Sequence, residues 1–268
     1  MEALEDAAFS SGAALARLDA VLRRDNLPQA LLRDRLALRA AEACMVFAGR
    51  QDRAGDLRDA VHLLRPGDLP GPAGETCLAW RRAVARPVGL RALHRALPDC
   101  APAQIAVWLD ARQGAPIARA AMVLEAVLTD LPRGEVPALI LADAVLAQAL
   151  GWDHLVPLLA PGLQRADLRK RGDELRLACH RAGAASALQA VRDAADLARR
   201  AAHLLAVAPK LRAKGAKDAV AMFLTQEAVA PAALPLSDRA ARRLCDRLVA
   251  LGAVRELTGR ETFRLYGL

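Results

Sequence analysis

The sequence predicts a mainly α-helical protein, with a multi-helix N-terminal body and a C-terminal end that closes in a short β-hairpin. Aromatic residues make up only 3% of the 268 residues, while Ala, Leu and Arg are abundant, so helix formers greatly outnumber strand formers. The last 32 residues, from Ser237 onwards, predict a capped amphipathic helix followed by two short runs of strand formers. These two observations give the fold class.

The N-terminal part is a series of helices separated by Pro and Gly. The first two, 7–24 and 30–48, are expected to form an antiparallel pair because their link is short. Residues 136–150 are nearly all apolar, which predicts a central buried helix, and Asp143 within it then needs a hydrogen-bond partner. The other helices predicted in this part are 75–86, 90–97, 103–113 and 117–131.

A domain boundary is expected where the composition becomes charged, between residues 163 and 181. We assign residues 1–181 to an all-helical body and residues 182–268 to a C-terminal unit. This unit starts with a long Ala-rich helix at 184–207 and has a second helix at 219–229. The link between these helices is basic, with Lys210, Arg212, Lys214 and Lys217.

The closing helix has marked ends and two distinct faces. Ser237 is a suitable N-cap, and Gly252 is a suitable residue to end the helix in a left-handed conformation. One face is an apolar stripe that includes Leu244 and Leu248, which we expect to pack on Phe223. The other face is basic and carries Arg239, Arg242, Arg243 and, at its flank, Arg247.

The hairpin completes a recognisable pattern. Its predicted strands, within 254–257 and 262–266, are joined by a Gly-containing turn with Arg260 at the tip, and Arg255 lies on the first strand. A capped basic helix followed by such a hairpin is typical of a winged helix-turn-helix. The Pro-rich segment 231–236 makes the turn before the helix longer than in the standard motif.

Several stretches resemble known families. The closing 32 residues resemble the C-terminal winged helix of many bacterial Fic-family proteins, and GAALARLDAVLRR with RLALRAAEA and GDLRDAVHLL resembles the helical N-terminal region of Fic proteins. The Fic catalytic motif, His-x-Phe followed by an acidic residue and Gly-Asn-Gly-Arg, does not occur in the sequence. The whole chain resembles a bacterial family of unknown function, often carried on plasmids, that shares RLALRAAEA, RPGDLPGPAGE, LLAVAPKLRAKGA and ELTGRETFRLYGL. This resemblance implies an architecture and no established activity.

The excess positive charge lies near the C-terminal end. The net charge is +8, and residues 199–268 contain 13 Lys and Arg against 6 Asp and Glu. A concentrated basic region is what release of counterions from a phosphate backbone requires, although an Arg-rich soluble surface would give the same count. Five cysteines without CxxC spacing, an acidic N-terminus and no long apolar run predict a cytoplasmic protein without membrane spans, nucleoid-associated if it binds DNA.

No pattern in the sequence predicts catalysis, a cofactor or a metal. The loop RPGDLPGPAG lacks the Lys and Ser or Thr of a phosphate-binding loop, and the scattered His and Cys residues do not form two close pairs as zinc requires. Trp152, Asp153 and His154 are adjacent, but neighbouring residues of a helix point in different directions, so we interpret them as packing residues.

The function expected from these patterns is binding of double-stranded DNA, as a transcriptional regulator or a plasmid or chromosome maintenance factor. A homodimer is the default assembly for this motif. The closing helix would enter the major groove, and basic side chains elsewhere would contact phosphates. The residues expected at the DNA are Ser237, Arg239, Arg242, Arg243, Arg247, Arg255, Arg260, Lys210, Arg212, Lys214 and Lys217.

Two other functions stay open at this point. The winged helix can serve as a protein-interaction module in a scaffold of the segregation type, with the helical body as a docking surface for a protein partner. An enzyme built on the helical body is the third hypothesis, but no residues can be assigned to it, and we expect no enzymatic activity.

Overall fold

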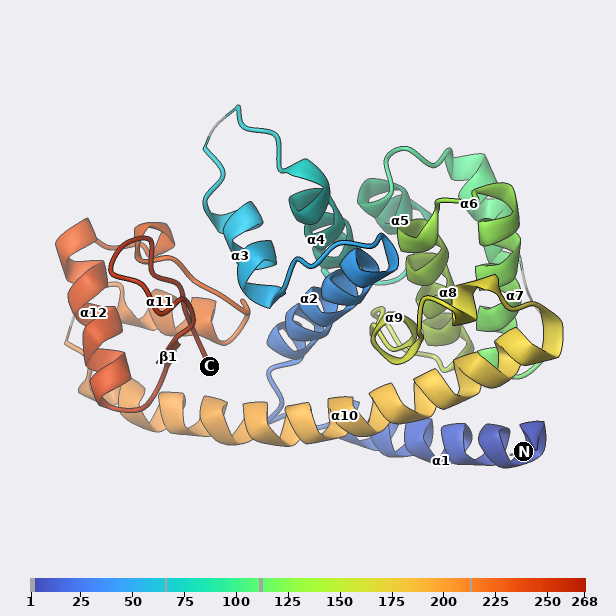
Figure 1. Ribbon diagram of the computed structural model, residues 1–268. Coiled ribbons are helices and arrows are strands. Elements are labelled where there is room, and N and C mark those ends of the chain that lie inside the picture. Colours follow the sequence, from blue (N-terminus) through green and yellow to red (C-terminus); the bar gives the residue numbers. More distant parts are fainter. Residues whose placement is uncertain (1–2, 66, 111–112, 213) are drawn as a thin grey trace.

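The computed structural model describes residues 3–65, 67–110, 113–212 and 214–268 (Figure 1). Over these ranges the chain is mainly helical and ends in a short antiparallel hairpin, which confirms the predicted fold class. Residues 111 and 112 of the predicted helix 103–113 lie outside the described ranges. The helices of the body are α1 (Leu4–Leu22), α2 (Gln29–Phe47), α3 (Ala54–His62), α4 (Gly71–Val84), α5 (Leu90–Ala96), α6 (Pro102–Leu109), α7 (Pro116–Asp130), α8 (Glu135–Ala149), α9 (Leu159–Gly162) and the 3-10 turn η1 (Asp167–Arg169).

The long helix α10 (Gly172–Val207) supports both the body and the C-terminal unit (Figure 1). α1 lies along it, and Ser11 Oγ and His180 Nδ1 are hydrogen-bonded there at 2.7 Å. The buried face of α10 is rich in Ala, which allows neighbouring helices to approach closely. The expected antiparallel pairing of the first two helices is therefore wrong, because α1 packs mainly on α10 while α2 packs mainly on α4.

Helix α8 is the central buried helix that its sequence predicts. Every residue from Ala138 to Ala147 is buried, including Asp143. The partners that Asp143 needs are the main-chain N–H groups of Leu158 and Leu159, which donate to its two carboxylate oxygens at 3.2 Å. Burial raises the pKa of Asp143 to about 8. None of the described helices, α8 included, is long and apolar enough to cross a lipid bilayer.

The C-terminal unit is a small winged helix. It consists of η2 (Ala208–Lys210), α11 (Ala216–Phe223), η3 (Pro231–Ala233), α12 (Asp238–Ala250), β1 (Arg255–Glu256) and β2 (Tyr266–Gly267). The two strands pair antiparallel, with Glu256 opposite Tyr266. Phe223, Leu244 and Leu248 are buried in the common core, so the predicted inner face of the closing helix is confirmed.

The helix predicted at 219–229 ends earlier than expected, and this changes the motif. α11 ends at Phe223, and Val229 pairs with Tyr266 through hydrogen bonds of 2.8 and 3.0 Å. Val229 thus adds a bridge to the hairpin instead of continuing the helix. The element directly before α12 is the 3-10 turn η3, so the first helix of the standard two-helix motif is reduced to one turn.

Both ends of α12 lie where the sequence predicts them. Ser237 is the N-cap residue, although its hydroxyl makes no capping hydrogen bond. Gly252 has φ +65° and follows the helix directly. The N–H of Gly252 donates to Val249, and that of Ala253 donates to Leu248, both at 2.9 Å. These two bonds form a Schellman motif, which satisfies the last carbonyl groups of the helix.

The predicted boundary between residues 181 and 182 falls inside α10. The helix begins at Gly172 rather than 184, because Leu175, Cys179 and Ala182 continue the buried face of its later part. Buried side chains from Ala14 to Leu268 form one hydrophobic cluster. The body and the C-terminal unit therefore share a helix and a core.

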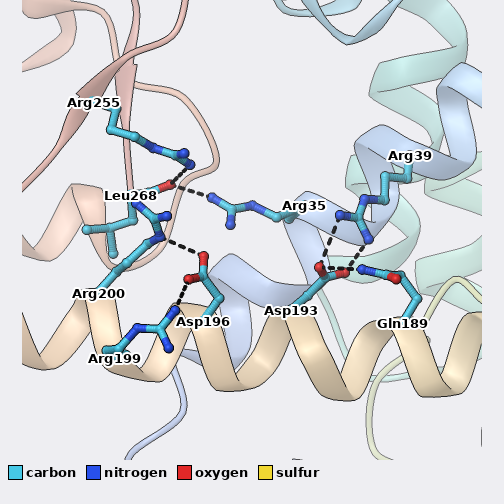
Figure 2. Close-up of polar contacts among 9 residues, drawn as sticks. All are labelled: Arg35, Arg39, Gln189, Asp193, Asp196, Arg199, Arg200, Arg255 and Leu268. Atoms are coloured by element: carbon cyan, nitrogen blue, oxygen red, sulfur yellow. Dashed lines mark hydrogen bonds and ion pairs between the residues drawn. The ribbon is translucent and has the colours of Figure 1, made fainter.

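Polar contacts also join the hairpin to the body. Figure 2 shows Arg35 of α2 and Arg255 of β1 pointing at the main-chain oxygen of Leu268, to which they donate at 2.7 and 3.2 Å. In the same view Arg39 of α2 forms an ion pair with Asp193 of α10. α2 is thus bonded to both α10 and the end of the hairpin.

A buried ion pair makes a second connection. Arg58 of α3 donates to both carboxylate oxygens of Glu227, at 2.8 and 2.5 Å. The main-chain N–H of Glu227 donates to Asp34 of α2 at 3.0 Å, and Asp34 is itself paired with Arg81 at 2.9 Å. Glu227 lies in the segment between α11 and α12, so this network holds that segment against the body.

Candidate nucleic-acid interface

A groove lined by five basic side chains lies between α12 and the segment that leaves α10. It is open to solvent and has a volume of about 590 Å³. α12 contributes Arg239, Arg243 and Arg247 to one wall, and Lys210 and Arg212 stand on the other. We refer to this hollow as the basic groove.

The spacing of the three α12 arginines explains the first wall. They are four residues apart, and residues at this spacing lie above one another on a helix surface. Ala240 and Leu244 lie beside them and form an apolar floor. The opposite side of α12 packs into the core through Ala241 and Leu248, which turns the arginine stripe outward.

The second wall follows from the end of α10. The 3-10 turn η2 closes with a hydrogen bond of 3.1 Å from Leu211 N–H to Ala208 O, and the Leu211 side chain packs against the core. Lys210 and Arg212 flank Leu211 on either side and are exposed. A half-buried anchor between two exposed cations thus places both charges at the groove.

The charge of the basic groove is unbalanced. Within the described ranges, none of its five cations has an acidic partner, and no carboxylate lines the groove. By contrast, exposed Arg199 and half-buried Arg200 of α10 are both paired with Asp196 (Figure 2). Like charges gathered without counterions repel one another, so an anion in the groove would be attracted and would stabilise it.

The N-terminus of α12 opens at one end of the same groove. Ser237 lines it, and its hydroxyl is free of any capping bond. The first N–H groups of a helix carry partial positive charge and are ready-made donors for phosphate oxygens. The helix dipole therefore adds to the field of the five side chains.

Arg242 lies on a different face of α12 from the other arginines. It pairs with Asp238 one turn earlier, at 3.0 Å, and both side chains are about two-thirds exposed. Together with Asp246 it borders a second hollow of about 610 Å³, between α12, the end of α3 and the hairpin loop. The structure therefore divides the basic face predicted for this helix into an unpaired stripe at 239, 243 and 247 and a mixed stripe at 238, 242 and 246.

The two hairpin arginines predicted at the DNA, Arg255 and Arg260, are both engaged in hydrogen bonds within the protein. Arg260 forms a bidentate ion pair with Asp59 of α3, at 2.6 and 2.8 Å, and donates to the carbonyl oxygen of Phe263. Arg255 donates to Leu268, as described above. The Arg260–Asp59 pair pins the tip of the hairpin to α3, away from the basic groove.

The remaining predicted residues are exposed but lie outside the groove. Lys214 follows residue 213, which is not among the described residues, and Lys217 lies in the first turn of α11. Neither lines the hollow. The apolar floor of Leu211, Ala240 and Leu244 was not predicted, and only the helical spacing of the last two residues could have indicated it.

Trp152 and His154, which the sequence analysis assigns to packing, border a separate hollow. Trp152 Nε1 donates to Asp19 of α1 at 2.9 Å. The hollow has a volume of about 430 Å³ and also contains Arg33 of α2. The residues that line this hollow come from segments far apart in the sequence. The hollow could therefore not be predicted from the adjacency of Trp152, Asp153 and His154 alone.

Comparison with known proteins bears on the whole chain. The family model described as “Protein of unknown function (DUF1403)” matches residues 1–268. No curated protein matches the chain. The match includes both the helical body and the winged helix, in line with the expected resemblance to an uncharacterised family. The chain therefore belongs to this family of proteins of unknown function.

Proposed function

We propose that this protein binds double-stranded DNA through the basic groove. The observation that carries the proposal is the convergence of Lys210, Arg212, Arg239, Arg243 and Arg247 around one open hollow, with no carboxylate among its described lining residues. Charge and spacing in the sequence predict all five of these residues, and they come from two segments about thirty residues apart. Release of counterions from a phosphate backbone favours the binding of DNA by such a cluster.

In this proposal the basic groove holds a phosphate backbone, and the exposed side of α12 faces the bases. Ser237 and the first N–H groups of α12 add phosphate contacts at the end of the groove. Arg242 can join them, because an exposed i, i+4 ion pair such as Arg242–Asp238 contributes only about 0.3–0.5 kcal/mol and is readily exchanged for a phosphate. Arg260 instead holds the hairpin against α3 through Asp59, and Arg255 is bonded to the main-chain oxygen of Leu268.

The biological role that fits such binding is that of a transcriptional regulator or a plasmid or chromosome maintenance factor in the cytoplasm, at the nucleoid. The resemblance of the closing residues to the winged helix of Fic-family proteins supports this assignment. The body of residues 1–181 then acts through binding, as a dimerisation or partner-docking surface, and not through catalysis.

The test is a comparison of two double variants by fluorescence anisotropy on a labelled random-sequence duplex. Arg239→Ala/Arg243→Ala removes two groove cations and is expected to weaken binding at 0.1 M salt roughly tenfold or more. The matched control is Arg91→Ala/Arg95→Ala, which removes two exposed cations at i, i+4 of α5, remote from the groove (Figure 1). Equal affinities of the two variants would refute the proposal.

A second candidate function, protein interaction, is favoured by one observation. Phe263 in the hairpin loop is 68% exposed and has φ +53°, an unfavourable conformation for a residue with a Cβ. It borders the 610 Å³ hollow together with Leu63 of the body. Apolar contacts survive high salt, so sedimentation at 1 M NaCl is expected to detect self-association that Phe263→Ala removes, if this surface serves a second copy.

A further inference from the structure

A half-buried arginine that makes no ion pair with any other described residue lies in the hollow formed by the end of α1, the start of α2 and the loop after α8. This hollow has a volume of about 430 Å³, within the range of small-molecule sites. Arg33 of α2 lines it, and within the described part of the chain the buried Nε of Arg33 has no hydrogen-bond partner.

The lack of a partner is unusual for this region of the molecule. The neighbouring arginines are satisfied: Arg23 pairs with Asp19, Arg81 with Asp34, and Arg35 donates to Leu268. Burial lowers the pKa of Arg33, but a guanidinium stays charged at any physiological pH. A half-buried cation that cannot lose its proton is stabilised by an anion, and among the described residues no carboxylate is paired with Arg33.

The other lining groups suit an organic anion. Trp152 is anchored by its bond to Asp19, and Leu22 and Val156 provide apolar surface. Burial, with the nearby charge of Arg33, lowers the pKa of His154, so its neutral ring can offer a hydrogen bond without adding charge. Asp19 is neutralised by Arg23, while Asp153 also lines the hollow and would repel a second negative charge.

We propose that this hollow binds a small monocarboxylate with an apolar or aromatic body, whose carboxylate pairs with Arg33 and whose body lies against Trp152. A guanidinium fork matches the geometry of a carboxylate. Arg33 also borders a smaller hollow of about 360 Å³ beside Arg82 of α4, which is a site distinct from this one and is separated by the experiment.

The experiment follows the indole N–H signals of ¹⁵N-labelled full-length protein, with Trp152→Phe assigning the signal of Trp152. The probes are phenylacetate, the neutral phenylacetamide and inorganic phosphate. Phenylacetate is expected to shift the Trp152 signal in a saturable way, and phenylacetamide and phosphate are expected to bind at least tenfold more weakly. Arg33→Gln is expected to weaken phenylacetate roughly tenfold or more, as loss of a charge-assisted bond does.

Two controls make the result decisive. Arg82→Gln removes a cation from the neighbouring hollow only and should leave phenylacetate binding unchanged. Arg239→Ala/Arg243→Ala should also leave it unchanged, which separates this site from the basic groove. No shift in the wild type, equal binding of phenylacetate and phenylacetamide, stronger binding of phosphate, or a loss in Arg82→Gln equal to that in Arg33→Gln would each overturn the proposal. If Arg33→Gln does not fold, the ranking of the three probes on the wild type still decides.

Discussion

Removing the charge of Arg58 is expected to destabilise the fold by about 3–5 kcal/mol, the usual result of leaving one member of a buried ion pair without its partner. The side chains of Arg58 and Glu227 are only 17% and 8% exposed, and their two hydrogen bonds are the direct link between α3 and the segment before α12. Glu227 in turn raises the pKa of Arg58 through that contact. Arg58→Met keeps much of the apolar stem but leaves the buried carboxylate of Glu227 without its ion-pair partner.

The matched control is Arg242→Met, because Arg242–Asp238 is also an arginine–carboxylate pair but is exposed. Its loss should change stability by no more than about 0.5 kcal/mol. Urea unfolding followed by circular dichroism at 222 nm measures both. The double variant Arg58→Met/Glu227→Leu removes both charges together and should recover most of the loss. A change below about 1 kcal/mol in Arg58→Met would refute the view that this ion pair holds the winged helix on the body.

Three further predictions concern the body. The folded pKa of Asp143, about 8, lies above its value in the unfolded chain, so its contribution to stability is complete at acidic pH and is lost as the pH rises to 8. Asp143→Asn should therefore gain stability relative to the wild type by up to about 1.4 kcal/mol per pH unit between pH 5 and 8, measured by urea unfolding. Gly162→Ala should lower stability by about 1–3 kcal/mol, because the new Cβ would lie 2.6 Å from main-chain atoms of Ala182. Gly12 has open space around it, so Gly12→Ala should raise stability by about 0.5–1 kcal/mol. Equal effects of the two substitutions would contradict the close contact of α9 with α10. All five cysteines are buried and free, and burial raises the pKa of Cys44 and Cys179 to about 12, so a thiol reagent at pH 8 should react with few of them before urea is added and with all five afterwards.

Most helix positions could be predicted from the sequence because their signals are local. Pro and Gly mark the ends, and apolar residues at helical spacing mark the buried faces, as for α8 and α12. The charged stretch at 163–181 predicts a boundary where the structure has the first three turns of α10, whose Leu175 and Cys179 are buried. A helix with a charged outer face and a charged linker can have the same amino-acid composition.

Non-local contacts could not be predicted in the same way. Val229 leaves the helical pattern because Tyr266 pairs with it, and Arg260 turns from the tip of the hairpin because Asp59, about two hundred residues earlier, lies beside it. Neither partner can be identified from the residues next to it in the sequence. The groove stripe of Arg239, Arg243 and Arg247 could be found, since helical spacing alone puts these side chains on one face.

The salt dependence of DNA affinity reports how many phosphate contacts the basic groove makes. Five unpaired cations in the basic groove predict that the logarithm of the association constant falls with the logarithm of NaCl concentration with a slope of up to about −4.5, at roughly 0.9 for each phosphate contact. Arg239→Ala/Arg243→Ala/Arg247→Ala should reduce the magnitude of this slope by about 2–3. No binding at 50 mM NaCl, or a slope that is the same in the triple variant, would contradict the assignment of the basic groove as the DNA-binding surface.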